Sequence, residues 1–292
     1  MPMFRDCLLL CVYLLSAVPA TLLAKPKEAP TSPRAYIETS YLIAPRTVGP
    51  FSLARRAYTP DAKAAGAAFH YAMSGQPDLS IDVFVYPLGQ RDQTQAIAEG
   101  MAAFRKDLAS AMTQGSYSRL DELDQTTLVL PTNDAPAAAP ANGTDAKVIA
   151  AIADAQLVVG EKLRLRTQLS STGKPMRSNG YLFYKQLYYF KVRVSADEDA
   201  VAQDAFEALA DQAALTLVPA IQVTSIGGCA KASIRVDADA TPEEQAVAMA
   251  REIKTHLGFN CYRTLKEAGI EDAARTADVV EIAYDAGDWK SQ

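Results

Sequence analysis

Apolar and polar residues alternate in short runs along much of the chain, which is the pattern of half-buried β-strands. Two such runs, residues 66–73 and 79–88, flank the turn sequence SGQPD. In the second run the β-branched residues Ile81, Val83 and Val85 share one face, because successive side chains of a strand point to opposite sides. These runs predict two strands joined by the turn.

Two longer segments space their apolar residues by three or four positions, which predicts amphipathic helices. The first is residues 91–115, where Gly115 supplies a stop signal. The second begins near the acidic sequence ADEDA, which suits a helix N-terminus because negative charge is favourable there, and Pro219 ends it. The apolar stripes consist of Ile97, Met101, Phe104, Leu108 and Met112 in the first helix, and of Phe206, Leu209, Ala213 and Leu217 in the second.

A hairpin rich in aromatic residues lies before the second helix. We predict its strands at residues 176–184 and 187–195, with residues 185–186 at the tip. One face of the second strand carries only uncharged side chains, so we expect it to pack beneath the helix that follows. Most of the aromatic residues are therefore predicted to belong to the core, and Tyr181 and Tyr189 are the candidates for exposure.

Basic residues suggest a docking surface on the sheet. Arg164 and Arg166 share one face of a predicted strand, and Lys191 and Arg193 share the charged face of the aromatic hairpin. If these strands are neighbours, the four cations and Tyr189 form a candidate docking surface for an anion or a partner protein. The alternative is ordinary outward-facing charge that keeps the sheet soluble.

The N-terminal residues predict export. Residues 1–24 combine Arg5, an apolar run and small residues at Ala20 and Ala24, which is the pattern of a signal peptide. Residues 25–35 are polar and punctuated by proline, so they predict a disordered tether. The alternative is an uncleaved membrane anchor, because the apolar run approaches the length of a membrane span. We expect a periplasmic or secreted protein, with no stable membrane insertion after cleavage.

Export changes the interpretation of the cysteines. Removal of the signal peptide leaves Cys229 and Cys261. In an oxidising compartment an isolated pair is most simply a disulfide. A metal site would need more ligands than His256 and the scattered carboxylates provide. We therefore predict a disulfide between Cys229 and Cys261.

Two further segments interrupt or extend this pattern. Residues 131–146 are a Pro/Ala-rich stretch of low complexity and predict a disordered insert. Residues 226–292 predict a small β-α-β extension, with strands at 231–238 and 278–285. Between them a helix begins with a capping box, Thr241 as N-cap and Glu244 three residues later, and its apolar stripe is expected to be buried. That stripe consists of Met249, Ile253 and Leu257, with Ala246 and Ala250.

Composition argues against several classes of function. Lysine and arginine are scattered and the net charge is −5, so the basic footprint of a nucleic-acid-binding protein is absent. The sequence contains no nucleophile elbow, phosphate-binding loop, dinucleotide motif or zinc-protease motif. His70, in a strand, and His256, at a helix end, are expected to be structural. We predict no catalytic residue, cofactor or metal ligand, and no enzyme activity.

The stretches FSLARRAY, SIDVFVYPL with its helix, and GYLFYKQLYYFKVRVSA with the helix ending in LVPAI resemble the Mog1/PsbP-like fold, and in particular the exported DcrB-like proteins of bacteria. The resemblance covers residues 36–225. It implies an α+β domain in which an antiparallel β-sheet carries two packed helices. The insert at 131–146 and the tail at 226–292 depart from it. Members of this group are mostly non-catalytic accessory or binding proteins, and the resemblance implies the same here.

Three hypotheses about function follow. The first is an exported, soluble, non-catalytic binding or assembly protein of the bacterial envelope, whose partner is another envelope protein or a small ligand. The second is an envelope hydrolase that uses carboxylates near His70, which requires His70 to line an open cleft within hydrogen-bonding reach of Asp82 or another acid. The third is a structural protein that stays anchored in the membrane by an uncleaved N-terminus.

Overall fold

The computed structural model describes residues 35–131, 143–231, 234 and 236–289. These residues all fall in one structural unit, Arg34–Gln292. The predicted signal peptide, nearly all of the predicted tether and most of the Pro/Ala-rich insert lie outside the described residues.

The larger of two sheets has eight strands, and every neighbouring pair in it is antiparallel. Both predicted hairpins are confirmed, as β4–β5 and β8–β9. Across the sheet the strands are β2 (Thr47–Val48), β3 (Phe51–Tyr58), β4 (Ala67–Met73), β5 (Gln76–Pro87), β9 (Tyr188–Asp197), β8 (Pro175–Lys185), β7 (Val159–Leu169) and β6 (Tyr117–Val129).

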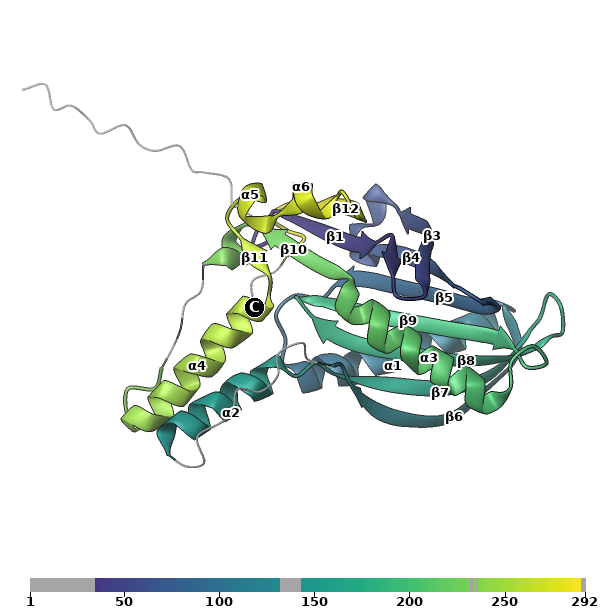
Figure 1. Ribbon diagram of the computed structural model, residues 1–292, viewed down its shortest axis with the longest axis horizontal. Coiled ribbons are helices and arrows are strands. Elements are labelled where there is room, and N and C mark those ends of the chain that lie inside the picture. The colour runs from purple at the N-terminus through teal and green to yellow at the C-terminus, as the bar shows by residue number, and fades with distance from the viewer. Residues whose placement is uncertain (1–34, 132–142, 232–233, 235, 290–292) are drawn as a thin grey trace, which may run out of the picture. The chain divides into compact units, whose positions relative to one another are not determined.

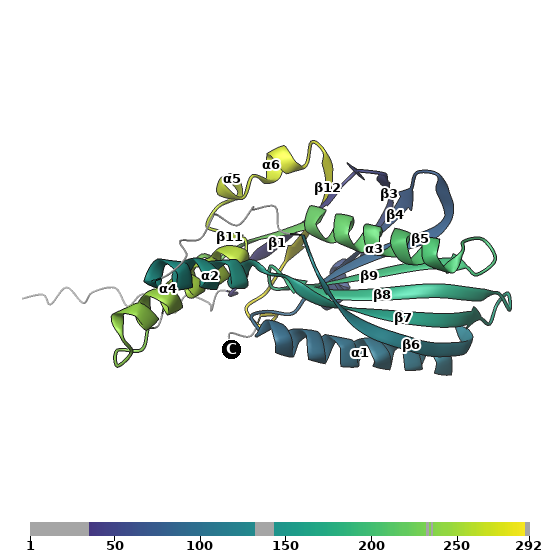
Figure 2. The ribbon, with the colours of Figure 1, turned by 60° about the horizontal axis from the view of Figure 1, so that its bottom comes forward.

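One long helix covers each face of this sheet (Figure 2). Helix α1 (Gln93–Thr113) packs against β6, β7 and β8, and helix α3 (Gln203–Ala220) packs against β5, β8 and β9. Both helices were predicted, and each buries most of its apolar stripe against the sheet, as Phe104 and Phe206 illustrate, whereas Met112 and Leu209 are only half-buried. The prediction of an α+β fold with two helices packed on an antiparallel sheet is therefore confirmed.

The aromatic hairpin supplies both cores, because its alternate side chains point to opposite faces. Phe183 and Phe190 join the core under α3, whereas Tyr184 and Tyr189 join the core under α1. Tyr181, like Tyr189, is buried, so the proposed exposure of these two side chains is wrong. The Tyr189 hydroxyl donates a hydrogen bond of 2.6 Å to a backbone carbonyl of α1. Tyr189 is therefore not part of a docking surface.

The turn of this hairpin lies one residue later than predicted, at Gln186 and Leu187. Both residues have left-handed backbone conformations, with φ of 53° and 68°, which two-residue hairpin turns require and which usually calls for Asn or Gly. Tertiary contacts hold them in place. Leu187 is buried and its carbonyl accepts hydrogen bonds from Leu88 and Gly89 at 3.0 Å, while the Gln186 side chain accepts one from Val223 at 2.7 Å.

The smaller sheet joins the start of the described chain to its end, in the order β11-β10-β1-β12. Figure 1 shows the yellow strand β12 running beside the purple strand β1. Only the β10–β11 pair is parallel. The strands are β1 (Thr39–Pro45), β10 (Gln222–Ile226), β11 (Cys261–Tyr262) and β12 (Ala277–Ala283).

The C-terminal tail is consequently built into the same sheet as the first strand. The predicted last strand is confirmed as β12. The strand predicted at 231–238 is wrong for the residues of that range that the structure describes. The strand nearest to this range is β10, which lies earlier in the chain and begins two residues after the end of α3.

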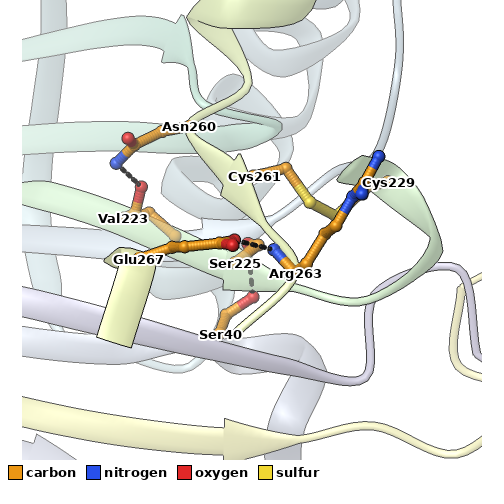
Figure 3. Close-up of a disulfide and its surroundings, with 8 residues drawn as sticks. All are labelled: Ser40, Val223, Ser225, Cys229, Asn260, Cys261, Arg263 and Glu267. Atoms are coloured by element: carbon orange, nitrogen blue, oxygen red, sulfur yellow. Dashed lines mark hydrogen bonds between the residues drawn. A yellow bond between two sulfur atoms is a disulfide. The ribbon is translucent and has the colours of Figure 1, made fainter. Parts of the chain in front are cut away.

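The predicted disulfide is confirmed, with the Cα atoms of Cys229 and Cys261 5.9 Å apart. Cys229 lies in the short helix η2 (Gly228–Ala230), and Cys261 is the first residue of β11. Figure 3 shows the bond near the hydroxyls of Ser40 and Ser225, which join β1 to β10 by a hydrogen bond of 2.9 Å. The disulfide thus ties the segment after β10 to the strand that follows the tail helix.

Two further helices pack against each other beyond the sheets (Figure 1). Helix α4 (Pro242–Gly258) is the predicted tail helix, and its capping box is confirmed by hydrogen bonds between Thr241 and Glu244. Helix α2 (Thr144–Gln156) was not predicted, and it begins inside the insert predicted at 131–146. The remaining helices are the short η1 (Pro60–Ala65), α5 (Leu265–Ala268) and α6 (Ile270–Ala273).

Candidate functional site

The sheet separates the four basic residues that were expected to form one surface. Strand β8 lies between β7 and β9. Its register places Arg164 opposite Asn179, and Asn179 opposite Val194. Because directly opposed residues share a face, Arg164 lies on the face of Val194 and not on that of Arg193. The predicted continuous docking surface is therefore wrong.

The two arginines of β7 lie on the α3 face and are held in ion pairs. The Arg164 guanidinium donates to Glu207 of α3 at 3.0 Å and to Asp124 of β6 at 2.7 Å. The Arg166 guanidinium donates to Glu198 at 2.6 Å. Their charges serve contacts within the protein, so they do not form an open cationic surface.

A polar network continues beneath α3. The Lys162 ammonium, whose side chain is 9% exposed, lies 2.8 Å from Glu207 and 2.7 Å from Asp211. Asn179 donates to Glu207 at 2.8 Å, and the Tyr181 hydroxyl donates to Asp211 at 2.7 Å. Burial alone would raise the pKa of Glu207, but these hydrogen bonds and the nearby Lys162 and Arg164 charges lower it below its ordinary value. The network positions α3 on the sheet.

Lys185 has a strongly lowered pKa. Burial lowers its pKa to about 7. The ammonium donates to the carbonyl of Ile221, which follows α3, at 2.8 Å and lies 4.5 Å from the centre of the Phe190 ring. These contacts link the hairpin tip to the end of α3, so we assign Lys185 a structural role.

Lys191 and Arg193 lie on the other face of the sheet, near the C-terminal half of α1. The Lys191 ammonium lies 4.8 Å from the ring centre of Phe104 and 3.3 Å from the exposed carboxylate of Asp107. The Arg193 guanidinium lies 5.5 Å from the ring centre of Tyr117. Both cations line a cavity of about 160 Å³. Of the predicted docking residues, this pair alone is brought together around a cavity.

The cavity also contains groups that the sequence did not single out. Arg193 Nε donates long hydrogen bonds to the hydroxyls of Ser178 and Ser195, at 3.4 and 3.3 Å. These two hydroxyls share a hydrogen bond of 2.8 Å. Neither the serines nor Tyr117 belongs to a motif. Ser195 lies two residues from Arg193 on the same face of β9, the strand register places Ser178 opposite Ser195, and Tyr117 comes from β6.

His70 lies within hydrogen-bonding reach of Asp82, as the hydrolase hypothesis requires. Its Nδ1 is 3.0 Å from Asp82 Oδ1, and the two side chains are 30% and 29% exposed. The residues are directly paired on β4 and β5. The hydrogen-bonding distance that the hydrolase hypothesis requires is therefore present. His70 does not line the cavity of Lys191 and Arg193, so this cavity is not the open cleft that the hypothesis also requires.

A shallow groove of about 680 Å³ lies along the N-terminal half of α1, next to β6, β7 and the end of α2. Its polar side chains are bonded to one another. Arg105 binds Glu122 and Gln125, and Gln125 donates to Glu161 at 3.2 Å. Thr127 also donates to Glu161, at 3.0 Å. The groove therefore offers few free polar groups for a ligand.

The apolar residues of α4 form an exposed stripe, contrary to the prediction that they are buried. Met249, Ile253 and Leu257, hereafter the α4 stripe, are 45%, 44% and 69% exposed. Helix α4 packs on α2, and no residue of α4 is buried. The prediction failed because amphipathic spacing shows that a helix has an apolar face but does not show what covers that face.

A small groove adjoins the α4 stripe. It has a volume of about 230 Å³ and is lined by the Cys229–Cys261 disulfide together with Ile234, Ile253 and Leu257. His256 also lines it, and within the described part of the chain its buried Nδ1 has no hydrogen-bonding partner. The stripe and the groove make one apolar surface beside the disulfide.

The described residues contain no group of three or more side chains arranged to hold a metal ion. Within the same part of the chain, no helix combines the length and the hydrophobicity that a membrane span needs. The disulfide is typical of proteins from oxidising compartments.

No protein-family model matches this chain, and no curated protein matches it with significant similarity.

Proposed function

We propose that this chain is an exported, non-catalytic binding or assembly protein of the bacterial envelope that docks a partner protein through the α4 stripe. The observation that carries the proposal is the exposure of Met249, Ile253 and Leu257 on one helix face. Contiguous apolar side chains on a protein surface mark interaction sites, because leaving them in water is unfavourable.

The geometry of the stripe favours a helical partner. Met249, Ile253 and Leu257 follow one another at intervals of four residues, so they form a ridge about 12 Å long. Ridges of this spacing pack between those of a second helix. The adjoining groove of about 230 Å³ can accept an apolar side chain at the disulfide end of the ridge. The proposed partner therefore presents an apolar helix face.

The proposed location and fold family have separate support. The signal-peptide pattern of residues 1–24 and the disulfide both fit the periplasm or the exterior of the cell. An antiparallel sheet with one helix on each face fits the Mog1/PsbP-like resemblance. N-terminal sequencing of the exported protein tests the location, and a mature start near Thr21 or Lys25 would remove the membrane-anchor hypothesis.

Site-specific photocrosslinking in the envelope tests the docking surface. A photoreactive residue replaces Leu257 in one variant and Glu271, an exposed residue of α6, in the control. We expect a reproducible protein adduct from position 257 that is absent at 271 and disappears when Ile253→Lys is added. No adduct at 257, or an adduct only to a second copy of this chain, would overturn the proposal.

A second candidate function is hydrolysis, which the His70–Asp82 hydrogen bond of 3.0 Å favours. A carboxylate on Nδ1 sets the imidazole tautomer and leaves Nε2 as a base for activating water. If this is the function, His70→Asn will lower the rate of hydrolysis of an activated ester by at least a factor of about 100. His256→Asn, the matched control, will leave it unchanged. Equal rates for wild type and both variants would exclude this candidate.

A further inference from the structure

We propose that Lys191 and Arg193 form a binding site for a small oxyanion, the carboxylate or phosphate group of a small molecule. The site lies on the α1 face of the larger sheet, in the cavity of about 160 Å³ that both side chains line. It is independent of the α4 stripe and would persist if the proposed protein docking were wrong.

Arg193 forms no ion pair with a carboxylate of the described residues. Its directly opposed neighbour is Asp82 of β5, but that carboxylate is bonded to His70 at 3.0 Å and receives a long hydrogen bond from Ser80 at 3.5 Å. Arg164 and Arg166 on the opposite face are both paired. Within the described part of the chain, Arg193 therefore has no carboxylate at ion-pairing distance, although Asp82 is its cross-strand neighbour.

The orientation of the guanidinium leaves its terminal nitrogens available. Only Nε donates to the Ser178 and Ser195 hydroxyls, and the guanidinium stacks 5.5 Å from the ring centre of Tyr117. Among the described residues no acceptor binds the two terminal nitrogens of Arg193. The parallel N–H donors of a guanidinium form a fork that matches the paired oxygens of a carboxylate or phosphate group.

Lys191 adds a second, partly desolvated charge to the same cavity. Its side chain is 17% exposed, and its ammonium lies 4.8 and 5.5 Å from the ring centres of Phe104 and Phe84. Asp107 also lines the cavity and pairs with Lys191 at 3.3 Å, but its own side chain is 68% exposed. Because the Asp107 end of this ion pair is exposed, water and salt weaken the attraction, and an anion in the cavity can compete with Asp107 for Lys191.

The size of the cavity sets the size of the ligand group. Sites for drug-sized molecules span roughly 300–1,000 Å³, whereas this cavity has about 160 Å³. It therefore accommodates one oxyanion group with a small substituent. Phe84, Phe104 and Tyr117 supply apolar walls, and the Ser178 hydroxyl supplies a further polar contact.

Titration calorimetry at constant ionic strength tests the site, because constant ionic strength separates binding from general screening. The probes are inorganic phosphate, sulfate and succinate. We expect at least one to bind saturably to the wild-type protein, and Arg193→Gln to weaken that binding at least tenfold. Arg166→Gln, the matched control on the opposite face, should bind like wild type.

The pattern across probes identifies the source of the anion. Binding of succinate but not of phosphate would indicate that the ligand carries a carboxylate. Binding of phosphate or sulfate but not of succinate would indicate a phosphorylated ligand. Arg193→Lys, which keeps the charge and loses the fork, should bind less tightly than wild type, and circular dichroism checks that each variant is folded. The inference is overturned if no probe binds saturably, or if folded Arg193→Gln binds as tightly as wild type.

Discussion

Glu207 joins α3 to the larger sheet through several polar partners. Its carboxylate accepts hydrogen bonds from Asn179 and from Gln203, both at 2.8 Å, and pairs with Lys162 and Arg164. Charged groups that are partly buried stabilise a fold only when each is paired. Removing this one carboxylate would leave both Lys162 and Arg164 with fewer partners.

Glu207→Gln is therefore expected to lower the free energy of unfolding at pH 7 by about 2 kcal/mol, the range for hydrogen bonds to charged groups. The pKa of Glu207 lies below its ordinary value in the folded protein. Its stabilising contribution is thus present above the unfolded pKa of about 4.3 and is lost as pH falls through the folded pKa.

Urea unfolding at pH 7, 5 and 3.5 measures this difference. The gap between wild type and Glu207→Gln should narrow at the lowest pH. Glu271→Gln, an exposed substitution on α6, should differ little from wild type throughout. Parallel curves for wild type and Glu207→Gln would contradict the expected linkage.

Gly180 lies on strand β8, at a point where helix α1 comes very close to the sheet. A Cβ atom at this position would lie 2.3 Å from the Phe104 ring. Gly180→Ala is expected to destabilise the protein by about 1–3 kcal/mol through overpacking. Gly258→Ala, where nothing lies within 4 Å of the new atom, should be neutral or slightly stabilising. Thermal unfolding of both variants checks the pair, and equal melting temperatures would contradict it.

At the scale of elements, α3 and α4 are both amphipathic helices, yet only α3 is covered. Phe206 of α3 is fully buried in the core beneath that helix, and Leu257 of α4 is 69% exposed. The difference arises from their surroundings. Helix α3 follows β9 and returns across the sheet, whereas α4 packs mainly on α2 within the described part of the chain.

Truncating each of these side chains should have very different effects. Phe206→Ala is expected to lower the free energy of unfolding by about 3–5 kcal/mol, because it opens a cavity in a packed core. Leu257→Ala is expected to change it by no more than about 0.5 kcal/mol. Denaturant unfolding of both variants measures this contrast. A large loss from Leu257→Ala would mean that α4 is covered in solution.

At the scale of the molecule, the two ends of the described chain are fastened together. Strand β1 lies between β10 and β12 in the smaller sheet. The C-terminal residues reach the main core, where the Tyr284 hydroxyl bonds that of Tyr188 at 2.6 Å and Trp289 packs on both rings. The tail therefore contributes to the stability of the larger sheet.

The disulfide is the covalent part of this fastening. It joins residues 32 positions apart, and the chain-entropy model gives such a loop about 3–4 kcal/mol of stabilisation. We expect the double variant Cys229→Ser, Cys261→Ser to unfold with a free energy lower by about that amount. Reduced wild-type protein should match it in the same denaturant series. Equal stability of oxidised wild type and the variant would show that the bond adds nothing.

Local sequence patterns were sufficient to predict most of the helices and strands. Several sequence patterns reflect interactions between residues that are near neighbours in the chain, and each is found in the structure. They are the period-two runs around Ile81 and Phe190, the helical stripes of α1 and α3, and the Thr241–Glu244 capping box. The cysteine pair was also predictable, because the two cysteines outside the predicted signal peptide allow one internal bond. Helix α2 was missed since it adjoins a low-complexity segment.

Which side chains share a surface, in contrast, depends on which helices and strands become neighbours in the fold. Inserting β8 between β7 and β9 sends Arg164 and Lys191 to opposite faces, and nothing near either residue encodes that placement. The same is true of the α4 stripe, whose spacing matches that of a buried helix although it is exposed. Local propensity acts over a few residues, whereas strand order and helix packing depend on contacts between residues far apart in the chain.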